Sequence, residues 1–332
     1  MNPFRIVDRT VGVPATAAFL ANAQVDQDLP RVAVYDSIWL RLTGTLTNAA
    51  YTTAPTKYAE TPENLIGSIQ VIATGALQDT IKAVDFAWVK RKTQFMEGTE
   101  PTRADVGTTN AAFAFETNGR LFFRSPRVVN YLNTLLDARR LAGLTLRTQW
   151  RDQTALVFGG VAGTSTLSAT SLLATAREYY GINPASNFRY VKEQQRSAAI
   201  AASQTEFLVP NLPVGNRYRR ICFKGTVGNS TFGDNSDSLF NNATSQNIKI
   251  RDGSLFPLNA NFFAIRAQNK EMFRIETMPA GYALWEPVQL GWDSEMYDAR
   301  LKQQLESLVD VNFTGGNTNT LQLTTEEYIE RV

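Results

Sequence analysis

The sequence predicts an all-β protein made of two tandem jelly-roll β-sandwiches (a double jelly roll), each with a short inserted helix. An internal repeat covers most of the chain. Most apolar segments are short, alternate with polar residues and are rich in β-branched and aromatic residues, as half-buried strands are. The length of 332 residues also exceeds what one hydrophobic core usually holds, so two cores are expected.

The repeat consists of six short matches that occur in the same order in both halves of the chain. Any one of them could arise by chance, but six in one order indicate a duplication. The separation between partners shrinks steadily along the chain, as a second copy with shorter loops would produce. The matches are Phe19-Leu20 with Phe207-Leu208, Leu40–Leu46 with Ile221–Val227, Ile72–Leu77 with Ile250–Leu255, Tyr131–Arg139 with Trp292–Arg300, Thr166-Leu167 with Thr320-Leu321, and Thr175–Tyr180 with Thr324–Ile329.

The strands of each copy follow from the alternation of apolar and polar residues. Residues 32–46 and 218–227 alternate clearly and predict one long strand in each copy. Gly75 and Gly253 each separate two apolar runs, where a turn with positive φ is commonly needed. We expect both glycines to close hairpins.

One helix is expected in each copy. Apolar residues fall at helical spacing over residues 128–141, with Gly143 as the C-cap, and again over residues 292–308. A short helical turn should end each copy, because the spacing of a capping box occurs at Thr175 with Glu178 and at Thr324 with Glu327. These elements divide the chain into an N-terminal arm (1–15), a first jelly roll (16–183) and a second jelly roll (184–332).

Composition limits the possible functions. The formal charge of +2 gives no strong field for polyanions, so we expect no direct, sequence-specific binding of nucleic acid. The chain has no His and a single Cys, Cys222, which excludes a His-based acid or base, a Cys–His metal site and an intrachain disulfide. Cys222 lies on a predicted strand and is expected to be a packed thiol. We therefore expect no catalytic, cofactor-binding or metal-binding residue, and no enzyme.

Three further groups of residues are open to a functional or a structural interpretation. The loop Asp234–Asp237 could bind a divalent cation, but its spacing matches no defined calcium loop and favours a solvated turn. Two basic clusters favour subunit contacts, Arg139-Arg140 and Arg217–Arg220. Five tryptophans could stack on sugars, but are more often packing residues of β cores: Trp39, Trp88, Trp150, Trp285 and Trp292.

At these residues the sequence resembles the double jelly-roll major capsid proteins of tailless icosahedral viruses, the lineage of tectiviruses, corticoviruses and the adenovirus hexon. The segment Leu65–Ile81 is similar to the strand, glycine turn and strand found early in such jelly rolls. The segments that end in Asp137-Ala-Arg139 and Asp298-Ala-Arg300 resemble the helices that the family inserts between its sixth and seventh strands. Within this lineage a bacteriophage protein is expected.

The resemblance implies a homotrimer whose jelly rolls form a pseudo-hexagonal capsomer in the shell of a virion, made in the host cytoplasm. It implies contacts with neighbouring capsomers, with vertex (penton) and minor capsid proteins and with an internal membrane where the virion has one. It transfers no catalytic residue. The alternative is a virion spike or carbohydrate-binding β-sandwich protein, in which exposed aromatic residues should gather on one face. A bicupin enzyme is excluded by the lack of His, and a hydrolase would need a cleft with two close carboxylates.

Overall fold

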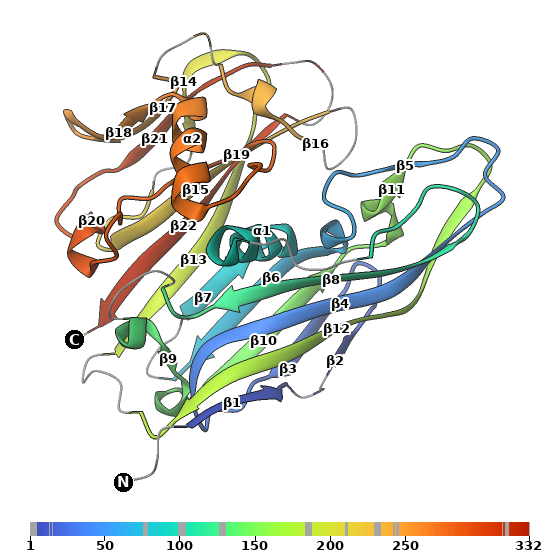
Figure 1. The fold of residues 1–332 in the computed structure, drawn as a ribbon, viewed down its shortest axis with the longest axis horizontal. Coiled ribbons are helices and arrows are strands. Elements are labelled where there is room, and N and C mark those ends of the chain that lie inside the picture. Colours follow the sequence, from blue (N-terminus) through green and yellow to red (C-terminus); the bar gives the residue numbers. More distant parts are fainter. Residues whose placement is uncertain are drawn as a thin grey trace. The chain divides into compact units, whose positions relative to one another are not determined.

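A computed structural model describes residues 5–12, 14, 16–75, 79–98, 104–125, 131–182, 188–209, 212–228, 234–241, 243, 246–313, 315 and 319–331. These residues form mostly β-strands, with two α-helices among them (Figure 1). They divide into two compact units, here called unit 1, up to Val191, and unit 2, Lys192–Glu330. The division falls inside strand β13 (Phe188–Ala199), a little after the expected boundary at residues 183 and 184.

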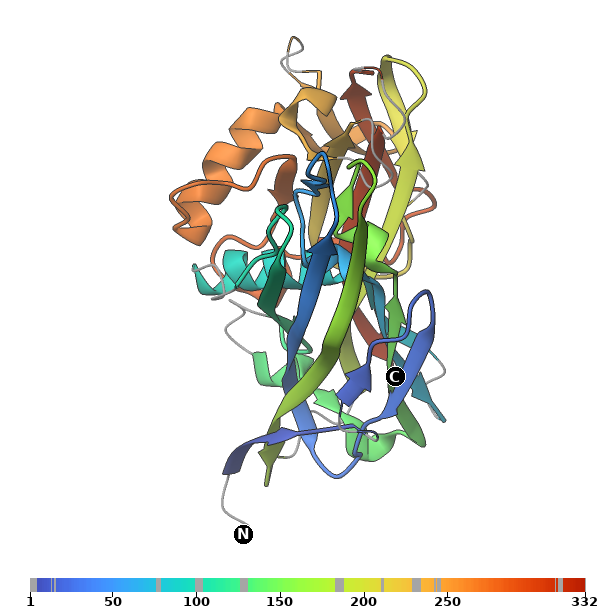
Figure 2. The ribbon, with the colours of Figure 1, turned by 90° about the vertical axis from the view of Figure 1, so that its right-hand side faces the viewer.

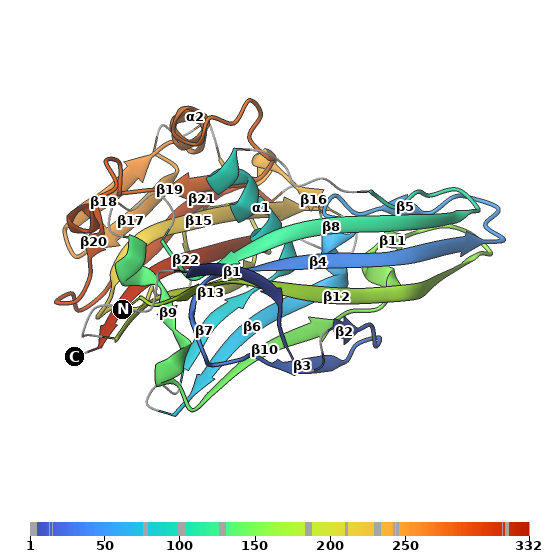
Figure 3. The same ribbon diagram turned by 60° about the horizontal axis from the view of Figure 1, so that its bottom comes forward.

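Unit 1 contains two antiparallel sheets of four main strands (Figure 3). The first has the order β1 (Arg5–Thr10), β12 (Thr164–Tyr180), β4 (Val34–Ala49) and β8 (Ala112–Phe122). The second has the order β3 (Gln24–Asp28), β10 (Gly143–Trp150), β6 (Ile66–Thr74) and β7 (Asp79–Val84). Counted along the chain, these strands lie in the orders 1-8-3-6 and 2-7-4-5, which is the jelly-roll arrangement.

Unit 2 repeats this arrangement with its own eight strands. Its first sheet joins β13, β22 (Thr320–Arg331), β15 (Arg217–Val227) and β19 (Tyr282–Trp285). Its second sheet has the order β14 (Gln204–Val209), β21 (Glu306–Val311), β17 (Ile248–Asp252) and β18 (Leu255–Ala260). The expectation of two tandem jelly rolls is thereby confirmed.

Short strands complete both units. In unit 1, β2 (Thr16–Ala18) pairs with β12, β9 (Leu136–Asp137) pairs with β4, and β5 (Thr56–Lys57) pairs with β11 (Val157–Phe158). In unit 2, β16 (Asp234–Asn235) and β20 (Tyr297–Asp298) both pair with β15. β9 and β20 therefore occupy the same place in the two units, each beside the third main strand.

The helices lie elsewhere than the periodicity predicted. Helix α1 (Phe86–Glu97) and helix α2 (Phe262–Phe273, orange in Figure 2) each follow the fifth strand of their unit, and α2 packs against β19. The segments expected to be helical lie between the sixth and seventh strands. Their described residues form β9, β20 and short 3-10 turns at Tyr131–Thr134, Ala138–Arg140 and Asp293–Glu295, and residues 306–308 already belong to β21.

Three smaller expectations are also wrong. Residues 5–10 are not an arm but the first strand of the first jelly roll, since Arg5–Thr10 pairs with Tyr180–Thr175 of β12. Gly143 begins β10 rather than capping a helix. The final helical turns do not form, because both capping-box segments are parts of strands. One lies in β12, which pairs with β4, and the other lies in β22, which pairs with β15.

Inward-facing side chains from the two sheets build a separate core in each unit. The core of unit 1 includes Ile38, Leu40, Leu42, Leu172, Ile69, Val71, Leu144 and Leu146. The core of unit 2 includes Val209, Ile221, Phe223, Ile248, Ile250, Val309, Leu321 and Leu323. Burial of these apolar surfaces is the main force that holds each sandwich together.

The ladders show how the two copies correspond. Each third strand carries a β-bulge opposite the eighth strand, at Asp36 in β4 and at Arg219 in β15. The residue before each bulge is a tyrosine whose hydroxyl donates to the carbonyl of a proline five residues earlier: Tyr35 to Pro30 O, at 2.6 Å, and Tyr218 to Pro213 O. Glu178 lies opposite Tyr35, and Glu327 lies opposite Tyr218.

This correspondence tests the individual matches of the repeat. The pairings of Glu178 with Glu327, of Asp137 with Asp298, and of the turns at Gly75 and Gly253 are confirmed. Three matches were misplaced. Gly225 corresponds to Leu42 rather than Gly44, Leu321 corresponds to Leu172 rather than Leu167, and Phe207 lies inside β14 whereas Phe19 precedes β3. The first of these is a shift of two residues, which keeps every side chain on its face, so apolar alternation could not detect it.

Candidate assembly surfaces

Cys222, the residue most open to a chemical role, is buried in unit 2, on the face of β15 opposite to the core residues Ile221 and Phe223. It is 1% exposed on β15, and its Sγ lies 3.7 Å from the carbonyl oxygen of Phe223. Among the described residues, no group of three or more Cys, Asp or Glu side chains lies close enough to hold a metal ion. The described helices are all too short or too polar to cross a membrane.

The acidic loop of unit 2 is held by its own contacts. Asp237 Oδ1 accepts hydrogen bonds from Arg266 Nη1, at 2.8 Å, and from the backbone N–H of Gly281, at 2.6 Å. Asp234 and Asn235 form β16. The carboxylate of Asp237 therefore ties the loop to α2 and to the start of β19, rather than standing in a freely solvated turn.

Many of the arginines form ion pairs with carboxylates of their own chain. Arg219 and Arg220 are buried beside Glu286, so the expectation that they form subunit contacts is wrong. On the outer faces of the sheets, arginines pair with carboxylates of neighbouring strands at Arg41–Glu116, Arg147–Asp26, Arg177–Asp8 and Arg251–Glu306. These pairs neutralise the faces and leave little charge for binding a polyanion.

The five tryptophans differ in exposure, and Trp39 and Trp285 are partly buried. Trp88 and Trp150 are buried, as expected of packing residues, whereas Trp292 is 50% exposed. Trp292 belongs to the loop after β19, in which Leu290 is 77% exposed. We call these two side chains the Leu290–Trp292 tip. They form an apolar projection from unit 2, whereas the sequence had favoured a packing role for Trp292.

One carboxylate fixes the backbone of this tip. The carboxylate of Glu295 accepts hydrogen bonds from the backbone N–H groups of Leu290 (2.9 Å), Gly291 (3.1 Å) and Trp292 (3.3 Å). Three successive N–H groups converging on one anion are a recognised way of ordering a loop. The tip is therefore held in one conformation before anything binds it, which lowers the entropy lost on binding.

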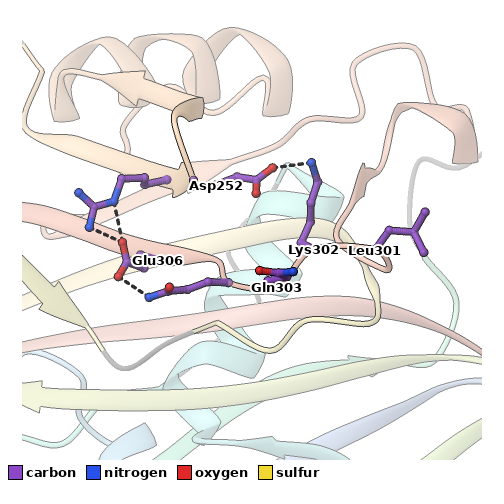
Figure 4. A pocket seen from close by; sticks show the side chains of 8 residues that line it. Asp252, Leu301, Lys302, Gln303 and Glu306 are labelled. Atoms are coloured by element: carbon purple, nitrogen blue, oxygen red, sulfur yellow. Dashed lines mark hydrogen bonds and ion pairs between the residues drawn. The ribbon is translucent and has the colours of Figure 1, made fainter.

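A second exposed surface lies at the turn between β17 and β18. A cavity of about 580 Å³ is lined there by Arg251, Asp252, Gly253, Leu301, Lys302, Gln303, Gln304 and Glu306 (Figure 4). Leu301 is 96% exposed at this cavity, and Leu255 and Phe256 follow the turn with 63% and 46% of their surfaces exposed. This end of unit 2 thus offers apolar side chains around a polar hollow.

The charges in the hollow neutralise one another. Lys302 Nζ lies 2.6 Å from Asp252 Oδ2, and Arg251 Nε lies 2.6 Å from Glu306 Oε2 (Figure 4). The hydrogen bond from Lys302 is the main reason that the pKa of Asp252 lies below its usual value, followed by the hydrogen bond from the Tyr297 hydroxyl. The hollow is therefore suited to contact with another neutral surface rather than to capture of an ion.

Comparison with known proteins gives a consistent result at the level of structure. No protein-family model and no curated protein sequence matches the chain. The major capsid protein of Sulfolobus Turreted Icosahedral Virus superposes with a TM-score of 0.73 and 13% identity, over 98% of this chain and 97% of its own.

Two further structures extend the likeness. The major capsid protein P2 of bacteriophage PM2 gives a TM-score of 0.61 at 10% identity, over 99% of this chain and 98% of its own. A chain of the PBCV-1 virus capsid gives 0.56 at 10% identity, over 99% and 94%. At identities this low, the superpositions show a shared fold and nothing more. The chain has the double jelly-roll fold of viral major capsid proteins.

Proposed function

We propose that this protein is a structural major capsid protein that forms trimeric, pseudo-hexagonal capsomers in the shell of an icosahedral virion. The observation that carries the proposal is that two jelly rolls in one chain match viral capsid proteins over nearly the full length of both. Three copies around a threefold axis place six similar sandwiches in a ring, which can contact neighbours on all sides. The proposed role is structural rather than catalytic.

The partners follow from the same proposal. The chain would bind itself first, then neighbouring capsomers, vertex and minor capsid proteins, and an internal membrane where the virion has one. The Leu290–Trp292 tip supports self-association, because it displays two large apolar side chains on a fixed backbone. Buried aromatic anchors of this kind contribute much of the binding energy of protein interfaces.

The mass in solution tests the proposal. Purified protein should sediment and scatter light as a trimer of the 36.9 kDa chain, and negative-stain images should show hexagonal particles. Obligate interfaces of this kind bury more than about 2,000 Å² and resist moderate dilution. A particle that remains a monomer at high concentration would contradict the proposal, and glycan binding by such a monomer would support the spike alternative.

A further inference from the structure

The two jelly rolls carry buried charges of opposite sign at the same structural position. The bulge residue of the third strand is Asp36 in unit 1 and Arg219 in unit 2, and the two side chains are 0% and 1% exposed. Each is paired with a side chain of opposite charge from the sixth strand of its own unit, or from the residues directly after that strand, together called here the sixth-strand segment. We propose that this reversal of charge directs each third strand to its own sixth strand and prevents exchange of strands between jelly rolls during folding.

In unit 1 the acidic residue lies on the third strand. Asp36 Oδ2 accepts from Arg120 Nη2 of β8 at 2.8 Å, and its other oxygen lies 3.4 Å from Arg124 Nε. Arg120 also donates to Glu97 of α1 at 2.9 Å. The third strand thus supplies the buried anion, and the sixth-strand segment supplies the cations.

In unit 2 the polarity is reversed. Arg219 and Arg220 of β15 both pair with Glu286, the residue that follows β19, and Arg220 Nε donates to Glu286 Oε2 at 2.9 Å. Arg220 Nη1 also lies 3.3 Å from Glu326 of β22. Here the third strand supplies the cations, and the sixth-strand segment supplies the anion.

Strand exchange would therefore bring like charges together. The two units share strand order and bulge position, so β4 could meet β19, or β15 could meet β8, within one chain or between two chains. Such pairing would place Asp36 beside Glu286, and Arg219 and Arg220 beside Arg120. Buried like charges are strongly unfavourable, whereas the native pairings give each of these groups a partner of opposite charge. Misassembly of this kind is a characteristic failure of proteins with repeated domains.

Refolding of two charge-reversed full-length chains tests the proposal. The first reverses unit 1 with Asp36→Arg, Glu97→Lys, Arg120→Glu and Arg124→Glu, which keeps each local attraction but gives both units the same polarity. The second adds Arg219→Glu, Arg220→Glu, Glu286→Arg and Glu326→Arg, which restores opposite polarity. The yield of native protein after dilution from denaturant is measured over a range of chain concentrations.

We expect the first chain to refold several-fold less well than wild type, with more oligomeric misfolded protein at higher concentration. The second chain should recover most of the yield although it carries twice as many substitutions. A yield that falls steadily with the number of substitutions, or one that is equal in all three chains, would overturn the proposal. Either result would leave the capsid function untouched, because that function is tested by the assembly of native protein.

Discussion

At the scale of single residues, the duplication provides pairs of equivalent residues, one in each unit, that differ in solvent exposure. Asp137 and Asp298 each accept hydrogen bonds from the backbone N–H and the guanidinium of the arginine two residues later, with Nε–Oδ1 distances of 2.7 and 2.9 Å. The Asp137 side chain is 9% exposed and the Asp298 side chain 47%. Asp137→Asn should lower the free energy of unfolding by about 1–2 kcal/mol. Asp298→Asn should cost less than about 1 kcal/mol, since solvent screens exposed pairs.

Urea unfolding of the two variants measures this difference, and equal losses would contradict it.

The contribution of Asp298 to the free energy of unfolding should also depend on pH. The hydrogen bond from Arg300 is the main reason that its pKa falls to about 2 from the ordinary 3.8. A depressed pKa means that the stabilisation is complete above the unfolded pKa and is lost as pH falls through the folded one. The stability gap between wild type and Asp298→Asn should therefore close between about pH 4 and pH 2.

At the scale of elements, the sequence predicted strands better than helices. Alternation identified 32–46 because the later part of β4 has one buried face, and it identified 218–227 although both faces of β15 are buried, since polar and apolar residues still alternate there. The helix predictions failed because apolar residues such as Leu135, Leu136 and Leu141 are buried as the chain crosses beside β4, not along a helical face. The real helices had readable caps, since Asp85 and Asn261 accept backbone N–H groups of the first turn.

The paired turns allow a sharper test at this scale. Gly75 has φ of 101°, and a Cβ placed there would lie 2.8 Å from the backbone N of Ala142. Gly253 has φ of 57°, and its Cβ would meet nothing within 4 Å. Gly253→Ala should therefore cost only the left-handed backbone penalty, about 1–2 kcal/mol. Gly75→Ala should cost clearly more, because a clash with backbone adds to the strain. Thermal or urea unfolding that ranks the two variants in the opposite order would contradict this reading.

At the scale of the whole molecule, the assembly surfaces could not be predicted from the sequence. Trp292 and Leu301 have the same residue types as the core, and only the folded chain shows that both are exposed. The basic clusters Arg139-Arg140 and Arg217–Arg220 suggested interfaces between subunits, yet Arg219, Arg220 and several other arginines pair within the chain. We therefore expect the proposed self-association to depend more on apolar surface than on free charge.

The Leu290–Trp292 tip provides the corresponding test of assembly. Leu290→Ser with Trp292→Ser should leave the chain folded with only a modest loss of unfolding free energy, since Leu290 is 77% exposed and Trp292 50% exposed. The same variant should raise the protein concentration needed for association, because it removes the apolar anchors. Glu295→Gln should have a smaller effect of the same sign, since it keeps the anchors but weakens the hydrogen bonds to three backbone N–H groups.

Val161→Ser is the matched control, because Val161 is a similarly exposed apolar residue of unit 1, at 56% exposure. Sedimentation velocity over a dilution series separates the outcomes. Loss of the trimer would place the tip inside the capsomer, whereas intact trimers that no longer form larger particles would place it between capsomers. If the double variant and Val161→Ser associate over the same concentrations as wild type, the tip has no part in assembly, and the fixed loop around Glu295 must serve only the fold of unit 2.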